Sequence, residues 1–215
     1  GSFFTTAVEI AGSGSALTLA SNIISSQPSS SSTTDQAVID APFGVTYEDI
    51  LIENNSILLG SYGLFFSGDF GAFQRTVVQN NFFLDQYFSG INFEGHVAPE
   101  IRRNYIRTIS DGFSFNAIYL YTCQGALRVE KNVVDQRLHG FGIYMENCFT
   151  NPLNRGLVAN NMIHIGEGGS GTGGGPAFGG GGGFAGLYLG FDNYNQDIYH
   201  NTIHVTPVSY THLTL

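Results

Sequence analysis

The sequence is poor in basic residues, low in overall charge and free of long apolar runs. Lysine and arginine together number 8 against 17 aspartates and glutamates, so the formal net charge is −9. This balance argues against nucleic-acid phosphates or anionic lipids as partners. No apolar run approaches the roughly 18 residues of a membrane-spanning helix, so no membrane span is predicted. Apolar residues still make up 42% of the 215, which is ample for a folded core.

Motifs for common cofactors are also missing. Residues 166–171 match a dinucleotide-binding fingerprint formally, but 13 of the 21 residues in 166–186 are glycine and no crossover helix follows, so the match carries no information. There is no GK[ST] motif, and the acidic residues are too scattered for a calcium site. No cofactor and no metal site is therefore predicted.

One six-residue phrase occurs seven times along the chain. It reads apolar, any, any, Asn, any, apolar, and the spacing of its asparagines runs from 23 residues (81 to 104) to 40 residues (161 to 201). The asparagines are Asn22, Asn55, Asn81, Asn104, Asn132, Asn161 and Asn201. A recurring period of this size indicates a solenoid.

A second phrase follows five of these copies. It reads Gly or Ala, apolar, any, apolar, and covers residues 63–66, 90–93, 117–120, 142–145 and 186–189. Each repeat thus holds at least two short strands of period two, joined by turns of variable length. Stacking the repeats in parallel, about 4.8 Å apart, would bury one continuous apolar column. The sequence predicts an all-β parallel β-helix of about seven coils.

The asparagines are predicted to hold this stack in register. A bend at each Asn lets both apolar positions of its phrase point inward, and Asn tolerates left-handed backbone. Stacked amides can also hydrogen-bond from coil to coil as a ladder.

The paired phrases resemble the right-handed parallel β-helix repeat of pectate-lyase-like proteins. The closest likeness lies in residues 157–163, 186–189 and 198–203, which look like secreted surface proteins of Bacteroidota. The resemblance covers about residues 7–206 and implies a right-handed coil. It implies no single activity, because this fold carries lyases, hydrolases, adhesins and structural spikes. Lyases of the fold generally use clustered acids for Ca²⁺ and a Lys or Arg base, a pattern that the scattered acids here do not follow.

The expected domain is residues 1–206, with a Ser-rich loop at 25–34 and a Gly-rich insertion at 166–186. Residues 207–215 resemble a translated sequencing adapter and are expected to be non-native. The chain is accordingly interpreted as a fragment with both ends cut. Its composition, with only 12% charged residues, fits a secreted or cell-surface protein.

Residues at the same offset from the second phrase in successive repeats are expected to lie beside one another and form rows on the surface. Two residues after the Gly of the second phrase, an outward row is predicted to contain Phe65, Asn92, Tyr119, Tyr144 and Tyr188. Exposed, coplanar rings along one face would bind a sugar chain, although aromatic residues also stabilise neighbouring strands by stacking.

Two further rows carry reactive groups. Glu94 and Glu146 lie two repeats apart, roughly 9–10 Å, which makes them candidate carboxylates for a hydrolase or simply solvated acids. Cys123 and Cys148, the only cysteines, are expected in adjacent coils in a row with Asp69, His96 and Asp192. A disulfide, a pair of buried thiols and a metal site with His96 are the alternatives for that pair.

Three functions follow as hypotheses. The first is a secreted or cell-surface β-helix whose polar, aromatic-lined face binds a polysaccharide, a cell-surface glycan or another surface partner. The second is a polysaccharide lyase or glycoside hydrolase acting on an extracellular polysaccharide, with Glu94 and Glu146 as its acids. The third is a structural spacer in a large surface protein.

Overall fold

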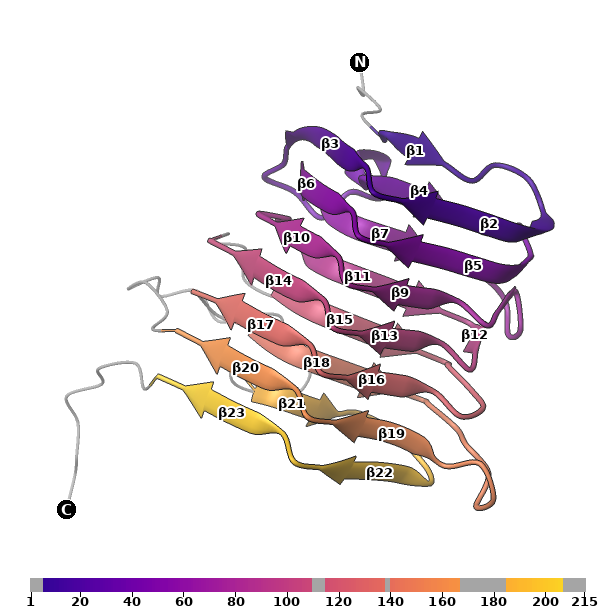
Figure 1. Ribbon diagram of the computed structural model, residues 1–215, viewed down its shortest axis with the longest axis vertical. Helices are drawn as coiled ribbons and strands as arrows, with labels where there is room; N and C mark the ends of the chain where they lie inside the picture. The colour runs from indigo at the N-terminus through magenta and orange to yellow at the C-terminus, as the bar shows by residue number, and fades with distance from the viewer. Residues whose placement is uncertain (1–5, 110–114, 138–139, 167–184, 207–215) are drawn as a thin grey trace.

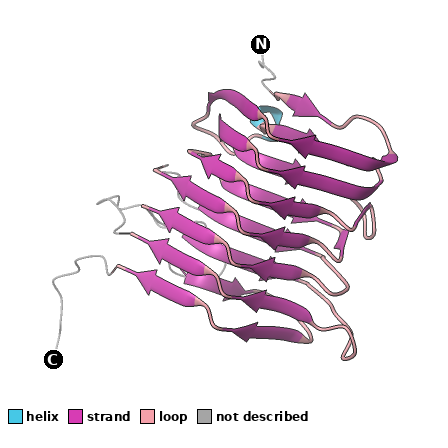
Figure 2. Ribbon diagram, in the orientation of Figure 1, coloured by secondary structure: helices cyan, strands magenta, loops and turns pink. Residues whose placement is uncertain are grey.

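The computed structural model describes residues 6–109, 115–137, 140–166 and 185–206. These residues form 23 strands and one three-residue 3₁₀ helix, Thr34–Gln36. Figure 2 shows how completely strands dominate the fold. Every strand pairing is parallel, so the predicted all-β, parallel arrangement is confirmed and is that of a parallel β-solenoid.

The strands belong to three sheets, here called A, B and C. Sheet A contains β1 (Val8–Glu9), β4 (Ile39–Ala41), β7 (Tyr62–Phe66), β11 (Ser89–Glu94), β15 (Phe115–Tyr121), β18 (Gly140–Glu146) and β21 (Ala185–Leu189). Sheet C contains β3 (Ile23–Pro28), β6 (Ser56–Gly60), β10 (Phe82–Leu84), β14 (Tyr105–Thr108), β17 (Val133–Gln136), β20 (Met162–Ile165) and β23 (Thr202–Val205). Sheet B contains β12 (His96–Val97), β8 (Phe73–Gln74), β5 (Tyr47–Glu53), β9 (Val77–Gln79), β13 (Glu100–Arg102), β16 (Arg128–Glu130), β19 (Gly156–Ala159) and β22 (Gln196–Tyr199), and β2 (Gly14–Ala20) pairs with β5.

Each full repeat contributes at least one strand to each sheet in turn, and the short strands β8 and β12 add a second strand to sheet B in two repeats. The chain passes from β9 in sheet B to β10 in sheet C and β11 in sheet A, and the next repeat lies directly beside it as β13, β14 and β15. Figure 1 shows the successive repeats stacked along the long axis from the N-terminal to the C-terminal end. All five expected strands of the second phrase fall within sheet A. The expected Ser-rich loop is in part strand, because Ser25 to Pro28 belong to β3.

The phrase asparagines form a continuous column between sheets B and C, and the five interior ones, from Asn55 to Asn161, are buried. In each interior step, one Oδ1 accepts from both the backbone N–H and the side-chain amide of the preceding asparagine. At Asn104 the two distances from Asn81 are 3.0 and 3.1 Å. The Asn104 amide then donates to Asn132 Oδ1 at 3.1 Å and to the carbonyl of Val78 at 2.9 Å. The amides therefore satisfy one another and join each repeat to both neighbours.

The left-handed backbone lies one residue earlier than the sequence indicated. The residues with positive φ are those that precede the seven asparagines: Ser21, Asn54, Asn80, Arg103, Lys131, Asn160 and His200, with φ between 55° and 59°. These residues make the turn, and the following Asn is thereby free to point inward. The prediction that the bend lies at the Asn itself is therefore wrong by one residue.

The two phrases meet inside the stack, which explains the small residue that opens the second one. A Cβ added at Gly90 would lie 2.8 Å from Ile106 Cγ2 and 2.7 Å from the carbonyl oxygen of Ala117. At Gly142 the same atom would lie 2.5 Å from Ile163 Cγ2. The apolar residue two positions after each Asn therefore fills the space that a side chain at the Gly would need.

The core is an apolar column enclosed by the three sheets. Its residues are stacked in register, as with Val78, Ile101 and Val129 in sheet B and Ile91, Ile118 and Ile143 in sheet A, and none of these six has measurable exposure. Among the described residues, no helix has the length and apolar character to cross a membrane.

Candidate functional site

Sheet A presents the predicted aromatic row on its outer face. The register pairs Phe65 with Asn92, Asn92 with Tyr119, Tyr119 with Tyr144, and Tyr144 with Tyr188. The residues on either side of the central row members, such as Ile118 and Leu120 around Tyr119, point into the core and have no exposure, whereas at the C-terminal end Leu189, next to Tyr188, is 43% exposed. Strand alternation therefore places these five side chains in one line across five neighbouring strands.

The rings of this row do not form the expected coplanar platform. Tyr119 and Tyr144 meet at 5.0 Å with an interplanar angle of 70°, and Tyr144 and Tyr188 meet at 4.8 Å and 83°. These are edge-to-face contacts, the arrangement that the ring quadrupoles favour over a face-to-face stack. Exposure also varies along the row, from 5% at Asn92 to 39% at Tyr188.

A second outward row borders the first and was missed in the sequence. It lies one residue before the Gly of each second phrase and contains Tyr62, Ser89, Asn116, Phe141 and Ala185. Phe141 lies 5.1 Å from both Tyr144 and Tyr188, so three rings form one contiguous cluster. The equal offset from the Gly was a usable signal, but the mixed chemistry of this row concealed it.

The two candidate carboxylates lie on the same face, in a third row. The register places Tyr121 between Glu94 and Glu146. The hydroxyl of Ser67 donates to Glu94 Oε2 at 2.7 Å. The hydroxyls of Tyr119 and Tyr144 converge on Glu146 Oε2, at 3.4 and 3.1 Å. The aromatic and acidic rows are therefore parts of one hydrogen-bonded surface.

The tyrosine hydroxyls of this surface are held in their protonated form. Burial, reinforced by the Glu146 carboxylate, raises the pKa of Tyr144 to about 12. The same causes raise the pKa of Tyr119 further. Both phenols are consequently hydrogen-bond donors at neutral pH, and they orient the Glu146 carboxylate.

The described strands of sheet A carry no lysine or arginine. All eight lysines and arginines of the chain are Arg75, Arg102, Arg103, Arg107, Arg128, Lys131, Arg137 and Arg155, and none lies in a strand of sheet A. The described strands of sheet A carry instead four acidic residues: Glu9, Asp40, Glu94 and Glu146. Ion pairs such as Arg75 with Asp49 and Arg155 with Asp197 lie outside this sheet.

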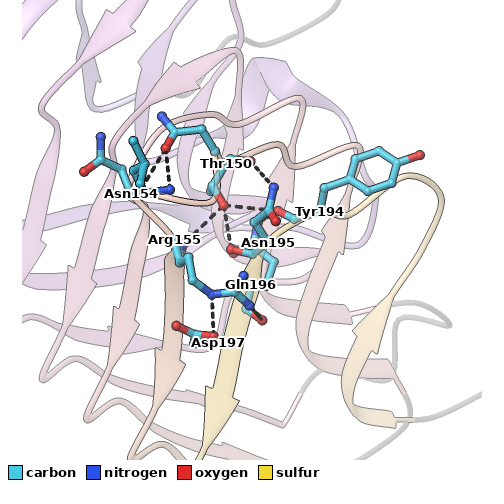
Figure 3. Close-up of polar contacts among 10 residues, drawn as sticks. Thr150, Asn154, Arg155, Tyr194, Asn195, Gln196 and Asp197 are labelled. Carbon is cyan, nitrogen blue, oxygen red and sulfur yellow. Dashed lines mark hydrogen bonds and ion pairs between the residues drawn. The ribbon is translucent and has the colours of Figure 1, made fainter.

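The turns that follow β18 and β21 are tied to each other by a polar network (Figure 3). The hydroxyl of Thr150 donates to the Asn195 carbonyl at 2.6 Å, and the Asn195 amide donates back to the Thr150 carbonyl at 2.6 Å. The Arg155 side chain donates to Asp197 at 2.7 Å. These contacts fix the last two repeats relative to each other, and with them the strands that carry Tyr144 and Tyr188.

The two cysteines occupy adjacent repeats inside the stack, as free thiols. Both are fully buried, no disulfide joins them, and burial raises the pKa of the Cys123 thiol well above its ordinary value. The expected neighbours in this row shift because of loop insertions. Phe73 pairs with His96 in place of Asp69, and Asn193 contacts the Cys148 backbone in place of Asp192.

His96 itself belongs to the core. It stacks between Phe93, at 4.1 Å, and Phe73, at 4.7 Å, and burial lowers its pKa to about 3. Among the described residues, no three His, Cys, Asp or Glu side chains are placed to hold a metal ion. Most of the Gly-rich insertion at 166–186 and all of the expected non-native tail at 207–215 lie outside the described residues.

Comparisons with protein-family models, with curated proteins and with solved structures found no match.

Proposed function

We propose that this protein is a secreted or cell-surface β-helix that binds a glycan through the outer face of sheet A. In finer detail, the proposal includes a right-handed helix of about seven coils related to the pectate-lyase-like proteins. The repeat phrases and the parallel register support this assignment.

The observation that carries the binding proposal is the combination of rings and fixed acceptors on one face. The contiguous rings of Phe141, Tyr144 and Tyr188 offer apolar surface to the faces of sugar rings that carry C–H groups. Beside them, Glu94 and Glu146 offer oriented oxygens to hydroxyl groups. Ligand sites generally combine aromatic walls with a few fixed polar groups in this way.

The edge-to-face packing changes the mode of binding that we propose. A sugar chain would not lie flat along one continuous aromatic strip, because neighbouring rings are turned by 70° and 83°. Individual sugar residues would instead pack on single rings, chiefly on Tyr188, the most exposed ring of the row, and on its neighbour Tyr144. The chain would then run across the strands, along the axis of the stack.

No specific observation favours catalysis over binding at this face. Glu94 and Glu146 remain candidates for an acid pair, and they lie two strands apart, roughly 9–10 Å. Tyr121 lies between them in the register, and each carboxylate already accepts hydrogen bonds from hydroxyl groups. We therefore assign the surface to binding.

A glycan array with the purified protein tests this proposal. Binding to a defined set of glycans is expected, and Tyr144→Ala should weaken it at least tenfold because the ring supplies contact area and orients Glu146. Tyr105→Ala is the matched control, since Tyr105 is also stacked on a neighbouring ring, Phe82 at 5.3 Å, but lies in sheet C. The proposal fails if no glycan binds, or if both variants bind as the parent does.

A further inference from the structure

We propose that the glycan bound by sheet A carries positively charged amino groups, as in a polymer of amino sugars that lack N-acyl groups. This inference rests on the proposed function and specifies the ligand class of the same face. It excludes uronate and sulfated polymers as preferred ligands.

The charged residues of sheet A are all acidic. Glu94 and Glu146 flank the aromatic rows, Glu9 and Asp40 extend the same sheet, and every lysine and arginine lies elsewhere. An anionic polymer would place its carboxylates or sulfates against acids with no cation to compensate them. A polymer with ammonium groups would be attracted instead, at the contact and over longer range.

The carboxylates are also arranged to receive such groups. In each, one oxygen, Oε2, is occupied by the hydroxyls of Ser67 or of Tyr119 and Tyr144. The other oxygen of Glu94 and of Glu146 receives no hydrogen bond from the described part of the chain. An ammonium group has three donors and makes strong, charge-assisted bonds to such an oxygen. The roughly 9–10 Å between the two sites suits amino groups two units apart on one extended sugar chain.

Two buried amides on the same face give an independent indication of a ligand. Asn92 and Asn116 are 5% and 9% exposed, and the side-chain oxygen of each has no hydrogen-bond partner within the described residues. Both lie in the outward rows of sheet A, and Asn92 is two residues from Glu94. Buried amide oxygens without a donor are rare. Because these two oxygens have almost no accessible area, an amino sugar would bond to them only after the amide groups turn outward.

Isothermal titration calorimetry with three oligosaccharides of equal length tests the inference. The probes are a glucosamine oligomer, its fully N-acetylated counterpart and a galacturonate oligomer. The glucosamine oligomer should bind about tenfold more tightly than the acetylated one, as one charge-assisted bond would provide. The galacturonate oligomer should bind most weakly, and added salt should reduce the preference for the amine.

Substitutions then assign the preference to the carboxylates. Glu94→Gln and Glu146→Gln should each weaken glucosamine binding severalfold and leave binding of the acetylated oligomer nearly unchanged. Glu48→Gln is the control, since this acid lies in sheet B beside Arg75. Equal affinity for the amine and acetylated forms, or tightest binding of galacturonate, would overturn the inference while leaving glycan binding intact. Failure of all three probes and of the glycan array would overturn the proposed function as well.

Discussion

Replacing one interior rung of the asparagine ladder should cost far more stability than replacing its end. Asn104 is 1% exposed, and its side chain takes part in four hydrogen bonds: two accepted from Asn81 and two donated, to Val78 and Asn132. In Asn104→Ala, the buried N–H of Asn81 and the buried carbonyl of Val78 both lose a partner. Each unsatisfied buried group costs about 1–3 kcal/mol, so we expect a loss of about 3–5 kcal/mol.

Asn22 provides the matched comparison at the first position of the same ladder. Its amide donates to Asn55 Oδ1 at 3.1 Å and to the Ala20 carbonyl at 3.0 Å, but the residue is exposed. Water can therefore replace what Asn22→Ala removes, and we expect a loss of about 1 kcal/mol or less.

Urea denaturation followed by circular dichroism measures both variants under identical conditions. The midpoint of Asn104→Ala should fall several times further than that of Asn22→Ala. Similar losses for the two substitutions would refute the reasoning, because they would mean that burial of the amide network does not determine its contribution.

Three further predictions concern buried and crowded positions. Burial lowers the pKa of His96 to about 3 in the folded protein. Below about pH 6.5, His96 therefore binds a proton in the unfolded chain but not in the folded protein. Stability should therefore fall by up to about 1.4 kcal/mol per pH unit below 6.5, and His96→Phe should reduce this slope in denaturant titrations. Burial, and then the charges of Glu9 and Asp35, raise the pKa of Asp40 to about 6, so its ionised form is penalised at pH 7. Asp40→Asn should stabilise the protein by about 1 kcal/mol at pH 7 after allowance for solvent screening, and the gain should disappear below pH 3.8, which a pair of melting curves would show. Gly90→Val should cost about 1–3 kcal/mol or more by chemical denaturation because its Cβ would meet packed atoms at 2.7 and 2.8 Å, and a melting temperature equal to that of the parent would contradict this packing.

The register of the fold could be predicted because it depends on residues that recur at fixed positions. The Asn phrase marks the same turn in all seven repeats, and the Gly phrase marks the same sheet A strand in five of them, so their offsets identify neighbours such as Tyr119 and Tyr144. The position of the left-handed residue could not be read in the same way. It is Asn in three repeats but Ser21, Arg103, Lys131 or His200 in the others, so no single residue type marks it.

The repeat pattern could not predict how the aromatic rings are oriented or which residues lie next to the cysteines. Whether Tyr144 stacks on Tyr188 or meets it edge to face depends on packing against Phe141, which belongs to a row of unrelated residue types. The neighbours of the Cys row were misplaced because variable turns shift the count between repeats. Phe73, for example, occupies the position expected for Asp69.

Hydroxyl-radical footprinting with and without a bound oligosaccharide tests most directly whether sheet A is the binding face. The account predicts that oxidation of Tyr144 and Tyr188 slows severalfold when the ligand of the glycan array is present, while oxidation of Tyr105 in sheet C is unchanged. Protection confined to sheet C, or no change at Tyr144 and Tyr188 under saturating ligand, would contradict it.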